Sequence, residues 1–482
     1  MKKLLVWIFC FFIGCQVHAQ KVQEPHFFAH SDSCASLSKV DQKIVGNITL
    51  EGNQTTKDKI LFRELLFKTG DTLSSRKLCE KMVKSRHNLL NLSVFNFVYM
   101  DTIHDVVHPE TILVKVRVIE RWYIWPLPIF ELADRNFNSW WENKDFRRAN
   151  YGIFLTYNNF RGRLEQLKVL LRAGYNQDYS IQYDIPYITS AQNIGIGFQL
   201  GHSLSREVPY TTFENRQLFY RATDGYARSE WYAKFKLSYR KGIHTYHQMS
   251  LSYEKSKYSD TLLTLNPRFM ESPKGAFQML HLNYYYKLDY RDSKPYPLNG
   301  HYLDVDFNQL GIGALPDEPA ISTLKSSFDV YRPISQRWFW AASITAKISG
   351  KNFQPYFLQK ALGFGNDFVR SYELYVIDGK DYALFKTNLK FALVEPKKRQ
   401  LPFIPSEKFS KIHYAAYINW LFDVAYVNNP HVQAYNNFSN RPLWGTGIGL
   451  DLVTYYDLVW RFETSINQFG EGGFFIHFVA PI

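Results

Sequence analysis

The feature that most constrains this fold is a two-residue alternation of apolar and polar side chains that recurs from about Trp122 to the C-terminus. In residues 231–240 every odd position is apolar and nearly every even position is polar. Residues 247–254 continue the alternation after a turn at 241–244. Because neighbouring side chains of a strand point to opposite faces, these segments predict strands with one apolar and one polar face.

The alternation recurs too often to be explained by an occasional half-exposed strand. Similar segments, separated by long polar connections, occur at 166–172, 281–287, 303–308, 340–347, 385–391, 414–426 and 458–466. At about 20 to 24 residues per strand and connection, residues 122–482 provide about 16 strands, so we predict a mainly β fold, an antiparallel transmembrane β-barrel. The alternative is a soluble β-sandwich, but its strands should be shorter and its outward face polar.

Composition agrees with a barrel and argues against a nucleic-acid partner. Aromatic residues make up 17% of the chain, and transmembrane barrels carry aromatic girdles at both membrane interfaces. The formal net charge is +13, but the 57 Lys and Arg residues are scattered singly along strand-like segments. We therefore expect basic lumen and loop surfaces, which face anionic lipid headgroups or polypeptides, and no nucleic acid.

The N-terminus has the layout of an export signal. Lys2 and Lys3 precede an apolar run, 4–14, that is too short to span a bilayer, and Val17-His18-Ala19 fits a cleavage site. We predict a signal peptide at 1–19 and a flexible lead-in at 20–42. The alternative is a lipoprotein site at Cys15.

Export also bears on the four cysteines. Cys10 and Cys15 leave with the signal, whereas Cys34 and Cys79 reach a compartment in which disulfides persist. The sequence leaves open whether Cys34 and Cys79 form a bridge. Neither has the neighbours of a metal site, and we expect no metal.

Residues 43–121 have a different pattern and predict a small α+β domain. A strand at 43–50 precedes a helix capped by Thr55 or Thr56, and Ser74 or Ser75 caps a second helix with apolar residues at helical spacing. Strands at 94–100 and 111–119 complete a β-α-α-β-β order. A generic small α+β domain is the alternative for this segment.

Two motifs in the barrel region support a family resemblance. The first is Asp289-Tyr290-Arg291-Asp292, followed by Tyr296-Pro297 and Gly300. The second is Leu362-Gly363-Phe364-Gly365, followed by Val369-Arg370-Ser371-Tyr372. They resemble the strand-turn-strand signature and the lumen-loop motif of the BamA/TamA superfamily of outer-membrane assembly factors, and residues 43–121 resemble its POTRA domain.

The resemblance implies that Arg370 lies inside the barrel and pairs with an acid on the inner wall. Asp423, in Leu421-Phe422-Asp423-Val424-Ala425, matches that acid. Ser371 replaces the usual Gly of the loop motif, Ala425 replaces a usual Gly of the wall motif, and Asn388 occupies the place of a second wall acid. A solvated Arg370 in an extracellular loop is the alternative.

The C-terminus predicts a last lipid-facing strand. Phe474, Ile476 and Phe478 alternate there, much like the C-terminal signal of such barrels, although the chain ends in Ile482 and not the frequent Phe. No nucleophile elbow, metal-ligand spacing or phosphate loop occurs in the sequence, so we expect neither enzymatic activity nor a cofactor.

The resemblance implies a protein of the bacterial outer membrane that handles polypeptides. A periplasmic POTRA domain would capture clients by strand addition, and a weakly paired seam between the first and last strands would let them enter the bilayer. The expected partners are the lipid bilayer, unfolded outer-membrane or secreted polypeptides and accessory assembly subunits.

The leading hypothesis is therefore insertion or assembly of other outer-membrane β-barrels, by a general or a dedicated factor. The alternative is a translocation pore of the two-partner secretion type, although such pores usually carry two POTRA domains and a plug helix. A passive porin would leave the small domain and the Arg370 motif unexplained. The sequence leaves the clients unidentified.

Overall fold

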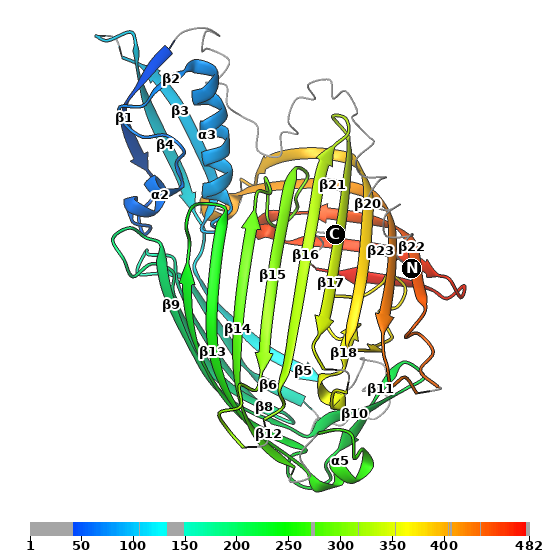
Figure 1. Cartoon of the computed structure of the whole chain (residues 1–482). Coiled ribbons are helices and arrows are strands. Elements are labelled where there is room, and N and C mark those ends of the chain that lie inside the picture. The colour runs from blue at the N-terminus through cyan, green and yellow to red at the C-terminus, as the bar shows by residue number, and fades with distance from the viewer. Residues whose placement is uncertain are drawn as a thin grey trace.

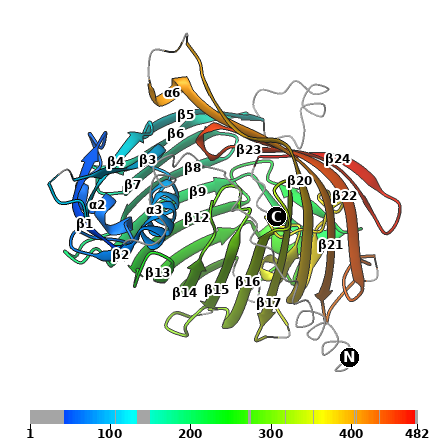
Figure 2. The same ribbon diagram turned by 90° about the horizontal axis from the view of Figure 1, so that it is seen from above.

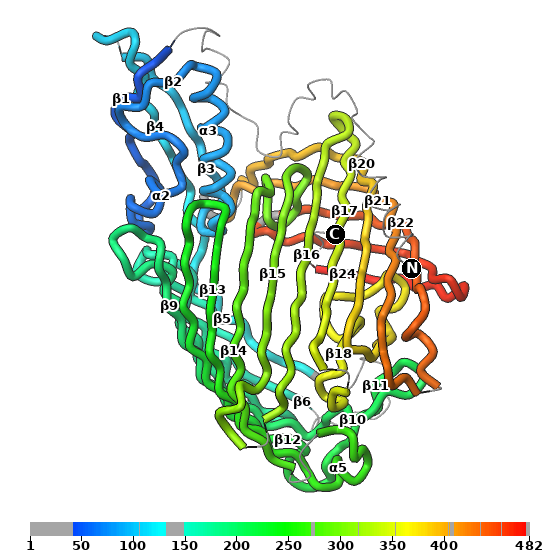
Figure 3. The backbone as a smooth tube through the Cα atoms, viewed as in Figure 1, coloured from blue at the N-terminus to red at the C-terminus, as the bar shows by residue number. Residues whose placement is uncertain are grey.

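The computed structural model describes residues 42–478 apart from 106, 133–148, 271–274, 317, 352, 403, 405–406 and 434. The signal segment, Cys34 and most of the lead-in lie outside these residues, so their assignments stay predictions. A small α+β domain stands on one rim of a large curved sheet (Figure 1). The chain runs from this domain through the sheet strand by strand (Figure 3).

The small domain is a four-stranded sheet in the order β2-β1-β4-β3, with two helices. Its strand and helix order agrees with the prediction, apart from a short extra strand, β2, between the helices. Gln42, which the sequence placed in the lead-in, is the first residue of β1. The elements are β1 (Gln42–Glu51), α2 (Asp58–Glu64), β2 (Thr72–Ser74), α3 (Ser75–Leu90), β3 (Phe95–His104) and β4 (Thr111–Glu120).

Local sequence explains α3 but not α2. Ser74 caps α3, as expected, because its side chain accepts a hydrogen bond from the Lys77 N–H, and Leu78 and Met82 are buried on one face. The expected threonine cap of α2 is wrong: Lys57 is the N-cap and provides no side-chain bond. Thr56 instead donates its hydroxyl to Glu120 on β4 at 2.7 Å, because buried Glu120 needs donors.

The large sheet contains 16 antiparallel strands, as predicted, and curls into a ring (Figure 2). Each strand pairs with the next one of the ring along the chain. In order, the strands are β5 (Ile124–Leu132), β6 (Ala149–Phe160), β7 (Glu165–Gly174), β8 (Gln177–Ile185), β9 (Ile194–Ser205), β12 (Arg228–Tyr239), β13 (Thr245–Tyr258), β14 (Ala276–Asp289), β15 (Gly300–Leu310), β16 (Ile321–Pro333), β17 (Trp338–Ser349), β20 (Asp381–Gln400), β21 (Lys411–Asn428), β22 (Pro442–Val453), β23 (Val459–Asn467) and β24 (Gly472–His477).

The register places the apolar side chains of neighbouring strands in rows on the outside. Phe235 on β12 lies between Phe198 on β9 and Leu251 on β13, and all three side chains are more than two-fifths exposed. Exposed apolar surface repeated around a sheet favours a lipid environment. Within the described part of the chain, no helix is long and apolar enough to cross a bilayer.

Shorter elements lie at the two rims. At the rim away from the small domain are β10 (Glu207–Phe213), β11 (Arg216–Arg221), α5 (Asp260–Leu265), η2 (Tyr356–Leu358), β18 (Lys360–Leu362) and β19 (Ile377–Asp378) (Figure 1). At the other rim are α6 (Glu407–Ser410) and η3 (Tyr455–Asp457).

The hairpin formed by β20 and β21 extends past the rim that carries the small domain. These strands have 20 and 18 residues, whereas about 9 to 11 residues suffice to cross a membrane. The extension bends toward the small domain (Figure 2). There the His413 ring lies 6.3 Å from the ring of Phe97 on β3, and Phe409 contacts Trp122 at the start of β5.

Two ion pairs join the small domain to the ring. Glu64 accepts two hydrogen bonds from Arg240, in the turn between β12 and β13, at 2.7 and 2.9 Å. Arg121 donates two to Asp457, between β22 and β23, at 2.7 and 2.9 Å. Because these turns belong to different parts of the ring, the pairs hold the domain in one orientation.

Glu64→Ala should destabilise this junction, because Arg240, whose side chain is only 16% exposed, would lose its counter-charge. We expect a loss of about 3 to 5 kcal/mol in the free energy of unfolding, measured by guanidinium unfolding in detergent. Glu80→Ala is the matched control: its exposed pair with Arg76 on α3 should contribute at most about 1 kcal/mol. Equal losses in the two variants would contradict the structural role of the junction.

Candidate functional site

The loop between β17 and β20 brings Arg370 against the inner wall of the ring. Arg370 is 2% exposed, and its guanidinium group donates to Asp423 on β21, as the resemblance implied. Its backbone N–H donates to the other Asp423 oxygen at 3.1 Å. Side chain and backbone of Arg370 therefore bind the same carboxylate, which is fully buried.

Arg370 has two further partners on the wall. Its Nε donates to Glu463 on β23 at 3.4 Å, and its Nη2 donates to Asn388 on β20 at 3.3 Å. The sequence motifs did not identify Glu463. This residue supplies a second wall acid for Arg370 from β23, whereas the resemblance placed such an acid at position 388. A signal was available, because Glu463 is a lone acid in the alternating segment 458–466. Side chains from three strands of the wall thus bind the guanidinium group of Arg370.

Two backbone features let the loop approach this wall. Ser371 adopts a φ of 66°, in the region that favours glycine, and its hydroxyl donates to the Glu471 carbonyl at 2.8 Å. Gly445 on β22 lies against the Arg370 backbone, where an added Cβ would overlap the Arg370 carbonyl oxygen. Val369 and Tyr372 are buried in an apolar cluster beside it.

Gly445→Ala should displace the loop, because neither backbone can yield easily at this contact. We expect increased protease cleavage within 363–376 in the folded, detergent-solubilised protein. Gly449→Ala on the same strand is the control, since its Cβ would come no closer than 3.3 Å, to the flexible Leu421 side chain. Identical cleavage of Gly445→Ala and the native protein would contradict this packing.

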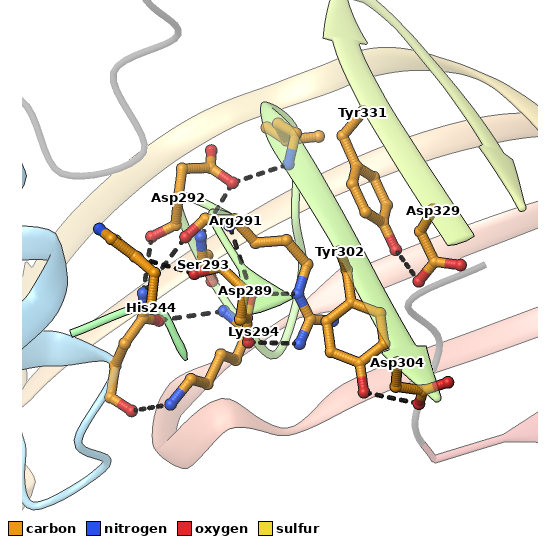
Figure 4. A network of polar contacts seen from close by, with 12 residues as sticks. His244, Asp289, Arg291, Asp292, Ser293, Lys294, Tyr302, Asp304, Asp329 and Tyr331 are labelled. Carbon is orange, nitrogen blue, oxygen red and sulfur yellow. Dashed lines mark hydrogen bonds and ion pairs between the residues drawn. The ribbon is translucent and has the colours of Figure 1, made fainter. Parts of the chain in front are cut away.

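The strand-turn motif forms a network between β14 and β15 (Figure 4). Arg291 donates to both oxygens of Asp289 at 2.8 and 2.9 Å, and its guanidinium lies over the Tyr302 ring. Gly300 has a φ of 114° and passes so close to the Tyr290 carbonyl that a side chain would overlap it. Pro297 lies in the turn that these contacts close.

This turn also binds the small domain, a contact that the sequence motif did not predict. Asn91, at the C-terminal end of α3, accepts from the Lys294 N–H at 3.1 Å and donates toward the carbonyls of Arg291 and Asp292. The strand-turn motif therefore closes the turn between β14 and β15 and also connects the ring to the small domain.

Asp292 is partly buried in the same turn. Its carboxylate accepts from the N–H groups of Ser293 and Leu298 at 2.8 and 3.1 Å. Burial nevertheless raises the pKa of Asp292 to about 6, because desolvation opposes the charged form more than these donors favour it.

This raised pKa predicts that the charge of Asp292 destabilises the folded protein near neutral pH. The folded state binds more protons than the unfolded state between the ordinary pKa of 3.8 and about 6, so stability falls as pH rises through this window. Asp292→Asn should therefore reduce the loss in the free energy of unfolding over this pH window by up to about 3 kcal/mol. Unfolding in detergent at pH 4 and pH 7 tests this, and the same pH dependence in both proteins would contradict it.

A second buried network lies on the same wall. Arg461 on β23 donates to both oxygens of Asp451 on β22 at 2.7 and 2.8 Å, and the Tyr296 hydroxyl donates to Asp451 at 2.8 Å. Tyr296 comes from the strand-turn motif. The turn thus reaches from the rim into the lumen and binds the wall that also holds Arg370.

The β10–β11 hairpin crosses the mouth of the ring opposite the small domain. At its tip, Asn215 donates from its backbone and its side chain to Asn436 and Asn437 at 3.0 and 3.1 Å. The hairpin connects β9 to β12, whereas Asn436 and Asn437 connect β21 to β22, on the opposite side by strand order. Thr212 also donates to Asp378 on β19 at 3.0 Å. Segments from three parts of the chain therefore meet over this mouth.

The ring is interrupted between its first and last strands. No ladder joins β5 to β24 among the described residues. Phe474, Ile476 and Phe478, the C-terminal strand residues singled out in the sequence, are each about half exposed or more on the outer face. The seam therefore borders the exposed apolar surface of the ring.

Other expected sites remain untested. Cys79 on α3 is disulfide-bonded, but Cys34 lies outside the described residues, so the pairing of Cys34 with Cys79 stays as open as the sequence left it. Among the residues that the structure describes, no group of His, Cys, Asp and Glu is arranged to hold a metal ion.

A family model of the Omp85 superfamily domain matches residues 159–454, more than half of the chain. The chain belongs to the Omp85 superfamily. A POTRA model, described as a surface antigen variable number repeat, matches residues 43–121. Omp85 proteins are outer-membrane β-barrels with periplasmic POTRA domains, and they act on client polypeptides. The resemblance noted from the motifs is thereby confirmed.

Solved structures with similar folds are distant. BamA from Haemophilus ducreyi lacking POTRA domains 1–3 is 15% identical, with a TM-score of 0.47 over 91% of this chain and 84% of that chain. CdiB from Escherichia coli and CdiB from Acinetobacter baumannii are each 14% identical, with TM-scores of 0.49 over 91% of this chain and 74% of theirs. Comparison with curated protein sequences finds no match.

Proposed function

We propose that this Omp85 protein inserts or assembles other β-barrel proteins in the outer membrane. The seam between β5 and β24, across which no ladder joins the described residues, carries this proposal. A client that leaves through a seam enters the bilayer directly, whereas a secreted client must leave along the axis of the barrel.

The obstructed lumen supports lateral release. The Arg370 loop is held against the inner wall by two acids, and the β10–β11 hairpin crosses the outer mouth. Removing an Arg from two buried carboxylates is unfavourable, since both carboxylates lose the hydrogen bonds and the counter-charge that Arg370 supplies. Axial passage would require both obstructions to move, but lateral passage would not.

The POTRA domain supplies a surface for the capture of clients. β3 is a ten-residue strand at the edge of its sheet. In this mode of recognition an extended polypeptide adds to a sheet edge through backbone hydrogen bonds, without a specific sequence. The ion pairs of Glu64 and Arg121 hold this edge at the rim of the barrel.

Depletion of the protein in its native host, followed by outer-membrane proteomics, tests the function. We expect several unrelated barrel proteins to decline, because they would share this insertion route. Loss of one secreted protein alone would favour the translocation pore. No change in either class would contradict both functions.

Complementation of the depleted strain tests the role of the lumen loop. Arg370→Ala and Asp423→Ala should each reduce the recovery of barrel proteins, and the double variant should be no worse than the poorer single variant, because both changes break the Arg370–Asp423 contact. Glu80→Ala, on the surface of α3, should complement fully. Additive losses would contradict a shared role for Arg370 and Asp423.

A further inference from the structure

A cavity of about 300 Å³ lies between the POTRA domain and the rim of the ring, where α3 stands above β13 and β14 (Figure 1). A single water needs about 10 to 15 Å³, so the cavity has room for a small polar ligand. Its walls include three residues of α3 and three residues in turns of the ring, which are Lys84, His87 and Asn88, and His244, Tyr290 and Asn299. A ligand in this cavity would contact the domain and the ring together.

The ring side of the cavity belongs to the outer face of the barrel. Tyr284 on β14 and Tyr290, just beyond its end, have the same parity, and both are more than two-fifths exposed. The Tyr290 ring stacks with His244 at 4.1 Å and with His301 at 5.0 Å between ring centroids. Stacked rings at the end of exposed apolar rows match the aromatic girdle that barrels place at the membrane interface. The cavity therefore lies at the level of lipid headgroups, on the POTRA side.

The cavity contains a cation without a counter-charge. Lys84 is exposed, and no acid among the described residues forms an ion pair with it. The turn opposite has two cations, Arg291 and Lys294, and two acids, Asp289 and Asp292, so its own charges balance. Asp292 lines the cavity, but its Oδ1 accepts from backbone N–H groups of that turn. Lys84 therefore gives the cavity an excess of positive charge, which favours an anion as the ligand.

Further donors in the lining suit a phosphate group. The His244 Nδ1 lies 2.7 Å from the Asp289 carbonyl oxygen, so Nδ1 carries a proton and donates. An anion near Nε2 would favour a second proton there, which makes the ring a charged donor. Asn299 adds a side-chain amide to the lining. A phosphate has several acceptor oxygens, which an ammonium, an imidazole and an amide can bind together.

We propose that this cavity binds the phosphate group of an anionic phospholipid from the periplasmic leaflet. Its position favours a lipid over a soluble anion, because the Tyr290 wall continues into the exposed apolar rows of β13 and β14, along which acyl chains can lie. Basic pockets at the headgroup level of membrane proteins bind lipid phosphates in this way. The inference goes beyond the proposed function and does not depend on the insertion of clients.

Calorimetric titration of the whole folded protein in non-ionic detergent tests the site, with dihexanoyl phosphatidylglycerol as the probe. Lys84→Gln should bind this lipid roughly fivefold more weakly than the native protein, because one cation leaves the cavity. Lys77→Gln is the matched control: Lys77 lies on α3 but not in the lining, so this variant should bind like the native protein. Equal affinities of all three proteins, or no binding by the native protein, would overturn the proposal.

Two further ligands separate an anionic lipid from other sources of phosphate. Dihexanoyl phosphatidylcholine has the same phosphodiester with a compensating positive charge, so we expect it to bind the native protein severalfold more weakly. Inorganic phosphate lacks acyl chains and should not displace phosphatidylglycerol at millimolar concentration. Displacement by inorganic phosphate would identify a site for a free anion, and equal affinity for the two lipids would contradict the role of charge. Either result would overturn the proposal.

Hydrogen exchange locates the bound lipid. Phosphatidylglycerol at the concentration that half saturates the native protein should slow backbone exchange in 84–91 and 290–300, because one ligand contacts both walls. The slowing should be markedly smaller in Lys84→Gln and unchanged in Lys77→Gln, and a heat-dependent gel shift checks that each variant is folded. Slowing confined to other segments, or equal in all three proteins, would contradict the proposed site.

Discussion

The structure depends on one constraint: backbone polar groups of a strand surrounded by apolar material must find partners on neighbouring strands. Sixteen strands meet it by a continuous antiparallel ladder from β5 to β24, which curls the sheet and gives it an inside and an outside. The lumen loop, the POTRA domain and the outer hairpin are all positioned by this ring. The seam between β5 and β24 is the place where the ladder of the described residues stops.

Buried charge organises the inside of the ring. Arg370 with its two acids, and Arg461 with Asp451, both lie on the wall formed by β20 to β23. Such pairs require close geometry, because a charge in a low-dielectric interior is stable only with its counter-charge. Gly445 permits that geometry by letting two backbones touch. These ion pairs therefore hold together the lumen side of the wall formed by β20 to β23, next to the last strand.

The two rims have different roles that follow from their contacts. At one rim, the ion pairs of Arg240 and Asp457, together with the Asn91 contact, attach the POTRA domain to separate turns of the ring. At the other, Asn215 binds residues from the opposite side and covers the mouth. In the proposed function, a polypeptide received at the first rim meets the β10–β11 hairpin along the axis and, among the described residues, a seam without a ladder at the side.

The sequence by itself determined the strands, their approximate number and the POTRA order, because a period of two and a helical period are local properties of the chain. Family motifs also placed Arg370 with Asp423. Tertiary structure alone decided the Glu463 contact, the Gly445 approach, the hairpin across the mouth and the failure of Thr56 to cap α2. These contacts join residues far apart in the chain, so they depend on the curvature and register of the whole ring.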